Sequence, residues 1–222
     1  MTHKPPANPE TIEKLALPAW VYETPFFERG GCVLLGSLLG PDVLDALRRE
    51  AAGMRARAVR HVWTGANTED WRGGEPARAF WAISGGACQY AIYCGQTMAP
   101  LLSEACGFRI QASGAGSYSY YHQPGDFLAV HRDIVRCDAT VITCLEETIP
   151  CAAGVPGTLR LHPASAFDPL SAVGRKPAGF WVDVPLRPGQ TALMLGGVVP
   201  HEVTPMIPGQ QRTVSVMCYR LD

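Results

Sequence analysis

The second half of the chain alternates short apolar runs with turn residues, a pattern typical of β-strands. From Phe108 onward, turn sequences such as QPGD at 123–126 and RPG at 187–189 interrupt these runs. Eight strands are predicted, at 110–121, 127–133, 139–145, 157–162, 180–184, 191–195, 201–204 and 212–219. No helical period of useful length separates them, so we expect a mainly antiparallel sheet. This number of strands suits the two facing sheets of a jelly roll.

The first half of the chain mixes helical and extended patterns. Gly40-Pro41-Asp42 predicts the start of a helix that runs to about Met54, and 84–106 has helical spacing with an interruption near Pro100. Strands are predicted at 31–35 and, from polar and apolar alternation, at 55–63, with a loop over 64–78.

These patterns predict one domain over 11–222, preceded by a flexible tail over 1–10, which is polar and rich in proline. We expect the part from about 11 to 107 to supply helices packed outside the sheet and a lid over the substrate. The β core should span about 108–222.

Composition narrows the function. With 47% hydrophobic and 18% charged residues, 222 residues can bury a full core, and a net charge of −1 gives no field that would favour nucleic acid or an anionic membrane. The N-terminus has no apolar signal segment, and no stretch is long enough to span a bilayer. The eight cysteines are spread singly, without a CxxC pair, which predicts reduced, buried thiols, no disulfide framework and a cytoplasmic location.

One cluster of residue types indicates metal chemistry. His131 and Asp133 lie two apart in a predicted strand, so their side chains should share one face, and His201 follows in a later strand. Two histidines and one carboxylate form the facial triad of non-haem Fe(II) oxygenases, which leaves coordination positions open. A histidine, a carboxylate and a histidine are also able to hold Zn(II) for a hydrolase or isomerase. The pair by itself is a weak motif, since a surface histidine beside a turn aspartate is a simpler explanation.

The surrounding residues make the pattern more specific. They are Tyr121, Gly125-Asp126-Phe127, His131-x-Asp133, Gly157-Thr158-Leu159-Arg160-Leu161, Pro200-His201-Glu202-Val203-x-Pro205 and Arg212. In this order and spacing the chain, over about 111–222, resembles the prolyl-hydroxylase-like branch of the 2-oxoglutarate- and Fe(II)-dependent oxygenases. The resemblance implies a distorted double-stranded β-helix, related to the jelly roll and the cupin fold, with helices outside one sheet.

The same resemblance implies a role for each motif residue. His131, Asp133 and His201 would hold Fe(II), and Arg212 would pair with the distal carboxylate of 2-oxoglutarate. Family members often carry Ser two residues after this arginine, but Val214 stands here. A hydroxyl partner for the carboxylate must then come from elsewhere, and Tyr121 and Thr143 are the candidates. Cosubstrates would be 2-oxoglutarate and O2, with ascorbate as a candidate reductant.

The expected activity is oxidation of a small molecule, such as an amino acid or a natural-product intermediate, because the chain is short beyond core and lid. Candidate substrate residues lie in the segment 55–81 and are Arg57, Trp63 and Trp71, although a solvated basic face also explains the arginine. Two alternatives stay open. One is a cupin-like module that binds metal or ligand without turnover, and the other is a hydroxylase of a peptide or protein residue.

Overall fold

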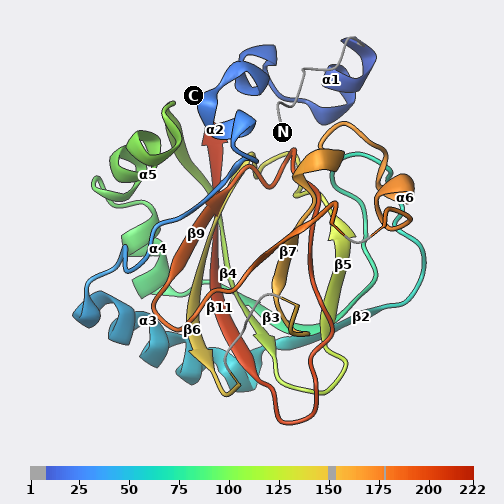
Figure 1. The fold of residues 1–222 in the computed structure, drawn as a ribbon. Coiled ribbons are helices and arrows are strands. Elements are labelled where there is room, and N and C mark those ends of the chain that lie inside the picture. Colours follow the sequence, from blue (N-terminus) through green and yellow to red (C-terminus); the bar gives the residue numbers. More distant parts are fainter. Residues whose placement is uncertain (1–8, 150–153, 178) are drawn as a thin grey trace.

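The computed structural model describes residues 9–149, 154–177 and 179–222, and its centre is a single curled sheet of eleven strands (Figure 1). The strands are β1 (Cys32–Leu34), β2 (Val59–Trp63), β3 (Arg78–Ser84), β4 (Ile110–Tyr121), β5 (Phe127–His131), β6 (Ala139–Glu147), β7 (Leu159–Leu161), β8 (Val182–Val184), β9 (Thr191–Met194), β10 (His201–Val203) and β11 (Arg212–Leu221). The helices and 3-10 turns are α1 (Pro9–Leu15), η1 (Ala19–Glu23), α2 (Pro25–Glu28), α3 (Pro41–Met54), η2 (Arg55–Arg57), α4 (Ala87–Tyr93), α5 (Met98–Cys106), η3 (Pro163–Ser165) and α6 (Leu170–Val173).

The strand order is β1-β9-β6-β11-β4-β3-β5-β10-β7-β8, with β2 paired to β3, and every pair is antiparallel. β3 joins the two halves of the sheet, because Trp81–Ser84 pairs with β4 while Arg78 and Ala79 pair with β5. The half that contains β6, β9, β11 and β4 faces the half that contains β5 and β7 (Figure 1). Side chains from both halves line one cavity, so the predicted double-stranded β-helix is confirmed.

Alternation along β4 separates the inside of the barrel from the outside. Tyr118 donates a hydrogen bond from its hydroxyl to Glu50 at 2.6 Å, and Tyr120 donates one to the carbonyl of Ala51 at 2.8 Å, so both rings face α3. Ser119 and Tyr121, which alternate with them, line the internal cavity. The helices therefore cover the outer face of the larger half and leave its inner face free for chemistry.

All eight strands predicted after Phe108 are present, but the first half differs from its prediction in three places. Strand β2 begins only at Val59, because α3 continues into the 3-10 turn η2, which closes with Ala58 donating to the carbonyl of Arg55 at 3.1 Å. The predicted helix over 84–106 is two helices, and Pro100 lies in the first turn of α5, where a missing N–H costs nothing. Strand β3 occupies a stretch for which no strand was predicted.

Of the predicted tail over 1–10, Pro9 and Glu10 belong to α1, and the remaining residues lie outside the described ranges. The division into a single domain at 11–222 stays a prediction. No helix in the described part of the chain is long and apolar enough to cross a membrane.

The prediction of uniformly reduced cysteines is wrong, because Cys137 and Cys218 form a disulfide. The two residues are 81 apart in sequence, but Cys218 lies in β11 opposite Thr140 of β6, and Cys137 precedes β6 by two residues. Cys32, Cys88, Cys94 and Cys106 are free thiols, while Cys151 lies outside the described residues. The expected cytoplasmic location rested on reduced thiols and loses that support.

Candidate functional site

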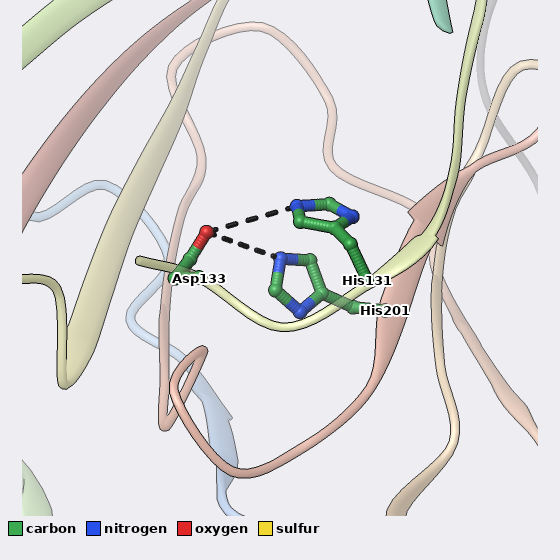
Figure 2. A group of neighbouring side chains, drawn as sticks. All are labelled: His131, Asp133 and His201. Atoms are coloured by element: carbon green, nitrogen blue, oxygen red, sulfur yellow. Dashed lines mark ion pairs between the residues drawn. The ribbon is translucent and has the colours of Figure 1, made fainter. Parts of the chain in front are cut away.

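Three side chains that the sequence singled out converge inside the barrel. His131 is the last residue of β5 and His201 the first residue of β10, and the two are register partners whose ring centroids lie 4.2 Å apart. Asp133 follows β5 by two residues, and its Oδ1 lies 3.7 Å from Nε2 of each histidine (Figure 2). One ligand atom from each residue lies within 4.8 Å of the others, which is close enough for a single metal ion to bind all three.

Backbone hydrogen bonds orient both imidazole rings. Nδ1 of His131 lies 2.9 Å from the carbonyl oxygen of Ala129, and Nδ1 of His201 lies 2.9 Å from that of Val199. A carbonyl oxygen only accepts, so Nδ1 carries the proton and Nε2 directs its lone pair towards Asp133. Burial lowers the pKa of His131, and the nearby ring of His201 lowers it further. The neutral, ligating form is therefore favoured.

The carboxylate of Asp133 is held by contacts that leave Oδ1 directed at the two rings. Its Oδ2 accepts a hydrogen bond from the hydroxyl of Thr140, and its backbone N–H donates to the carbonyl of Gly196 at 2.9 Å. A Cβ at Gly196 would come within 2.0 Å of Oδ2, so no side chain fits at this position. Burial raises the pKa of Asp133, but the two histidines lower it by more, so the group is ionised.

Two buried arginines fix the loop that carries Asp133. Arg72 donates to the carbonyls of Asp133, Ile134 and Val135 at 3.1 to 3.3 Å and forms an ion pair with Asp138 at 2.5 Å. Arg132 is 1% exposed and donates to five backbone carbonyls, those of Trp71, Ser165, Ala166, Asp168 and Val198. No pattern in the sequence indicates that either arginine is buried. Their hydrogen bonds keep the backbone on both sides of the carboxylate in place.

The triad lies on the wall of a cavity of about 200 Å³. Arg212, the first residue of β11, lines the cavity and is 2% exposed, and its register partner Tyr121 lines it as well. The guanidinium donates to the carbonyls of Gly157 at 2.9 Å and Leu186 at 3.1 Å. Burial raises the pKa of Tyr121, which keeps the phenol protonated at neutral pH even though Arg212 partly offsets the shift.

A second, more open cleft of about 440 Å³ meets this cavity at the triad, and it is also lined by His131 and Asp133. Residues of the segment 55–81 line it, which is where the substrate was expected. The residues of this segment that line the cleft are His61, Gly73, Gly74, Pro76, Arg78 and Phe80.

The other four candidate residues, Thr143, Arg57, Trp63 and Trp71, line neither the cavity nor the cleft. Thr143 is on the opposite face of β6 from the cavity, with its hydroxyl 2.9 Å from that of Thr191, because the cavity is lined by the alternate residues Thr140 and Ile142. Arg57 is exposed in η2. Trp71 lies under the guanidinium of Arg132 at 5.7 Å and under the ammonium of Lys14 at 5.5 Å. Trp63 shares a sheet face with His61 but does not line either cavity.

No family model and no curated protein sequence matches the chain. Solved structures do match it. A prolyl-4-hydroxylase from Pseudomonas putida is 19% identical with a TM-score of 0.55, over 86% of this chain and 93% of the other. The fold is that of the 2-oxoglutarate- and Fe(II)-dependent oxygenases. The non-heme alpha-ketoglutarate-dependent epimerase SnoN from nogalamycin biosynthesis is 16% identical with a TM-score of 0.63, over 96% and 83% of the two chains.

Two further structures extend this oxygenase-fold comparison. EctD from S. alaskensis is 15% identical with a TM-score of 0.60, over 93% and 80% of the two chains. SnoN is also known in complex with Fe3+, alpha-ketoglutarate and nogalamycin RO. At these identities the similarity establishes the fold, and the fold inferred from the sequence motifs is confirmed.

Proposed function

We propose that the chain is an Fe(II)- and 2-oxoglutarate-dependent oxygenase that oxidises a small molecule. The observation that carries the proposal is the placement of the triad and of Arg212 on the walls of one cavity of about 200 Å³. A candidate metal ligand set and a permanent cation therefore line the same cavity. This arrangement suits a cosubstrate with a metal-binding end and a carboxylate at its other end.

The donor set fits iron in this proposal. Nε2 of His131, Nε2 of His201 and Oδ1 of Asp133 would be the protein ligands, and three such ligands on one side leave positions for a 2-oxo acid and O2. When bound, the iron supplies activation of O2 for oxidative decarboxylation of 2-oxoglutarate and oxidation of the substrate.

Arg212 would bind the distal carboxylate of 2-oxoglutarate. Its hydrogen bonds to the carbonyls of Gly157 and Leu186 hold the planar guanidinium in one orientation, and the fork of N–H groups matches the two oxygens of a carboxylate. Tyr121, opposite Arg212 in the register, would supply the hydroxyl partner as a protonated phenol. The apolar side chains of Ile142 and Leu159 in the same wall would help to exclude water.

The proposed substrate is a small molecule because the cleft on the other side of the triad is of about 440 Å³. Among proteins of the same fold, SnoN belongs to nogalamycin biosynthesis, while a prolyl hydroxylase from Trichoplax adhaerens is known in complex with a peptide fragment. A screen for compounds that stimulate succinate formation therefore includes a peptide library beside small molecules, and stimulation by a peptide would favour the competing function.

The decisive experiment measures succinate formed from 2-oxoglutarate by the protein supplied with Fe(II) and O2, with and without ascorbate. We expect slow formation by the protein alone and stimulation by the substrate. In Asp133→Ala, succinate should vanish and the affinity for Fe(II) should fall by more than about a hundred-fold, because a ligand itself is lost. Tight binding of metal without binding of 2-oxoglutarate or formation of succinate would support the non-catalytic module instead.

Arg212→Gln tests the cosubstrate end of the cavity separately. We expect the KM for 2-oxoglutarate to rise by about ten-fold or more, as for loss of a charged hydrogen-bonded pair, with little change in Fe(II) affinity. Arg212→Lys should retain part of the affinity because it keeps the charge but not the fork. An unchanged KM in Arg212→Gln would remove Arg212 from the cosubstrate site.

A further inference from the structure

The floor of the open cleft is built from three adjacent strands. On the face that borders the cleft, β2 presents Val59, His61 and Trp63, and these lie opposite Ala82, Phe80 and Arg78 of β3. Directly opposite residues of an antiparallel pair share one face, so the six side chains form two adjoining rows. Tyr121 of β4 continues the middle of this grid towards the cosubstrate cavity.

The middle of the grid is a stack of three rings. The rings of His61 and Phe80 are 5.8 Å apart and inclined by 27°, and those of Phe80 and Tyr121 are 5.2 Å apart and inclined by 23°. The surroundings are apolar as well, because Leu128 and Val216 line the cleft and Ile134, beside Asp133, is 51% exposed there. Apolar surface left open next to a reactive centre is where an apolar substrate binds most favourably.

Arg78 lies at one end of this apolar floor and has few partners of its own. Its side chain is 23% exposed, its Nη2 makes only a 3.5 Å contact with the exposed Glu75, and its Nε has no hydrogen-bond partner. The other arginine that lines the cleft, Arg132, donates to five carbonyls. Among the cleft residues that the structure describes, Arg78 is therefore the arginine whose guanidinium is not held by backbone carbonyls.

We propose that the substrate is a small molecule with an aromatic or otherwise apolar body and one carboxylate, the body lying on His61 and Phe80 and the carboxylate pairing with Arg78. The assignment rests on the proposed function and specifies its substrate class. A single guanidinium fork matches the two oxygens of a carboxylate. A phosphate would call for further donors, and the described lining of the cleft offers no second available cation.

The test measures binding by calorimetry to the protein loaded with Fe(II) and 2-oxoglutarate under argon, so that no turnover occurs. The probes are 3-phenylpropionate, the uncharged 3-phenylpropanamide and 2-phenylethyl phosphate. We expect the acid to bind about ten-fold or more tightly than the amide. In Arg78→Leu the affinity for the acid should fall to that for the amide, and Arg78→Lys should lie between. Phe80→Ala should weaken acid and amide alike.

The matched control is Arg109→Leu, which removes an arginine that is 85% exposed and paired with Asp222, and it should leave all affinities unchanged. The inference is overturned by an acid-to-amide ratio that Arg78→Leu leaves intact, by phosphate binding more tightly than the acid, or by no saturable binding of the acid. Binding of Fe(II) and 2-oxoglutarate is measured in the same proteins. If Fe(II) and 2-oxoglutarate bind normally while the affinity for the acid does not depend on Arg78, only this inference fails. If Fe(II) and 2-oxoglutarate do not bind, the proposed function fails.

Discussion

The loop that carries Asp133 and the floor of the open cleft use arginine in opposite ways. Next to Asp133, Arg72 and Arg132 are buried and donate to backbone carbonyls. On the cleft floor, Arg78 is partly exposed and has only a long contact to Glu75. The first two guanidinium groups behave as part of the backbone scaffold, while the third behaves as a binding group.

This contrast follows from the free energy of burying charge. A desolvated guanidinium is tolerated only if nearly all of its N–H groups have acceptors, and once they have, the group rigidifies whatever it binds. The backbone around Asp133 is held in this way on both sides. The cleft floor has no such network, which leaves it free to adapt to a ligand.

The largest effect should come from Arg72→Met, because it leaves the Asp138 carboxylate, whose side chain is 8% exposed, without its partner. We expect the free energy of unfolding to fall by about 3–5 kcal/mol, as for other broken buried pairs. Arg78→Leu should change it by less than about 1 kcal/mol. Urea unfolding of the two variants beside the wild type measures both. Equal losses would show that the two arginines do not differ in role.

Reduction of the Cys137–Cys218 disulfide should have the next largest effect. The bond closes a loop of 81 residues that contains Thr140 and His201, and reduction should lower the free energy of unfolding by about 2–4 kcal/mol. Thermal melts with and without reductant measure the change. The double variant Cys137→Ser/Cys218→Ser is the control, since its melting temperature should not respond to reductant. An unchanged wild-type melt would argue against a bond in the native protein.

Thr140→Val tests the hydrogen bond that holds Asp133, the proposed carboxylate ligand of the metal. Without the hydroxyl that donates to Oδ2 of Asp133, the affinity for Fe(II) should fall by about 10–100-fold. Thr143→Val is the matched control. Thr143 lies three residues further along β6, and its hydroxyl contacts Thr191 on the opposite face of the strand. Anaerobic metal titration compares the two. A larger loss of Fe(II) affinity in Thr143→Val than in Thr140→Val would contradict the assignment of the Thr140 face of β6 to the metal site.

The smallest expected effect concerns pH. Burial lowers the pKa of His122 to about 4, with a further contribution from the charge of Arg55, so the folded protein binds a proton here less readily than the unfolded chain. Stability should therefore decline as the pH falls from 6.5 towards 4. In His122→Gln this part of the decline should disappear. Unfolding curves across the range measure it, and parallel pH profiles for variant and wild type would contradict the assignment.

The second half of the fold and the triad were predictable because both depend on local spacing. Turn residues delimit the strands after Phe108. Two histidines and a carboxylate at this spacing indicate a metal site even when the arrangement of the strands is unknown. Asp133 itself lies two residues beyond the end of β5, so its place beside His131 depends on the loop after the strand and not on strand alternation alone. Trp71 shows the limit, since only the tertiary fold places it against Arg132 and away from the cleft.

Arg72, Arg78 and the disulfide could not be predicted for a related reason. Each depends on segments that are distant in the sequence, such as β3 joining β4 to β5, or Cys218 lying beside Cys137. The sequence around a single arginine or cysteine does not indicate whether its side chain is buried or which residue it contacts.

The position of β11 has a consequence for how the protein forms during translation. This strand is inserted between β4 and β6, although it is the last to be synthesised of the three. The edge of β4 stays unpaired while roughly 90 residues are added and that of β6 while roughly 65 are added, which takes on the order of ten seconds at ribosomal rates. Unpaired β edges of this kind recruit other chains. The nascent protein is thus most prone to aggregation just before Arg212 emerges, and the same strand that ends this exposure also delivers the cavity's buried cation.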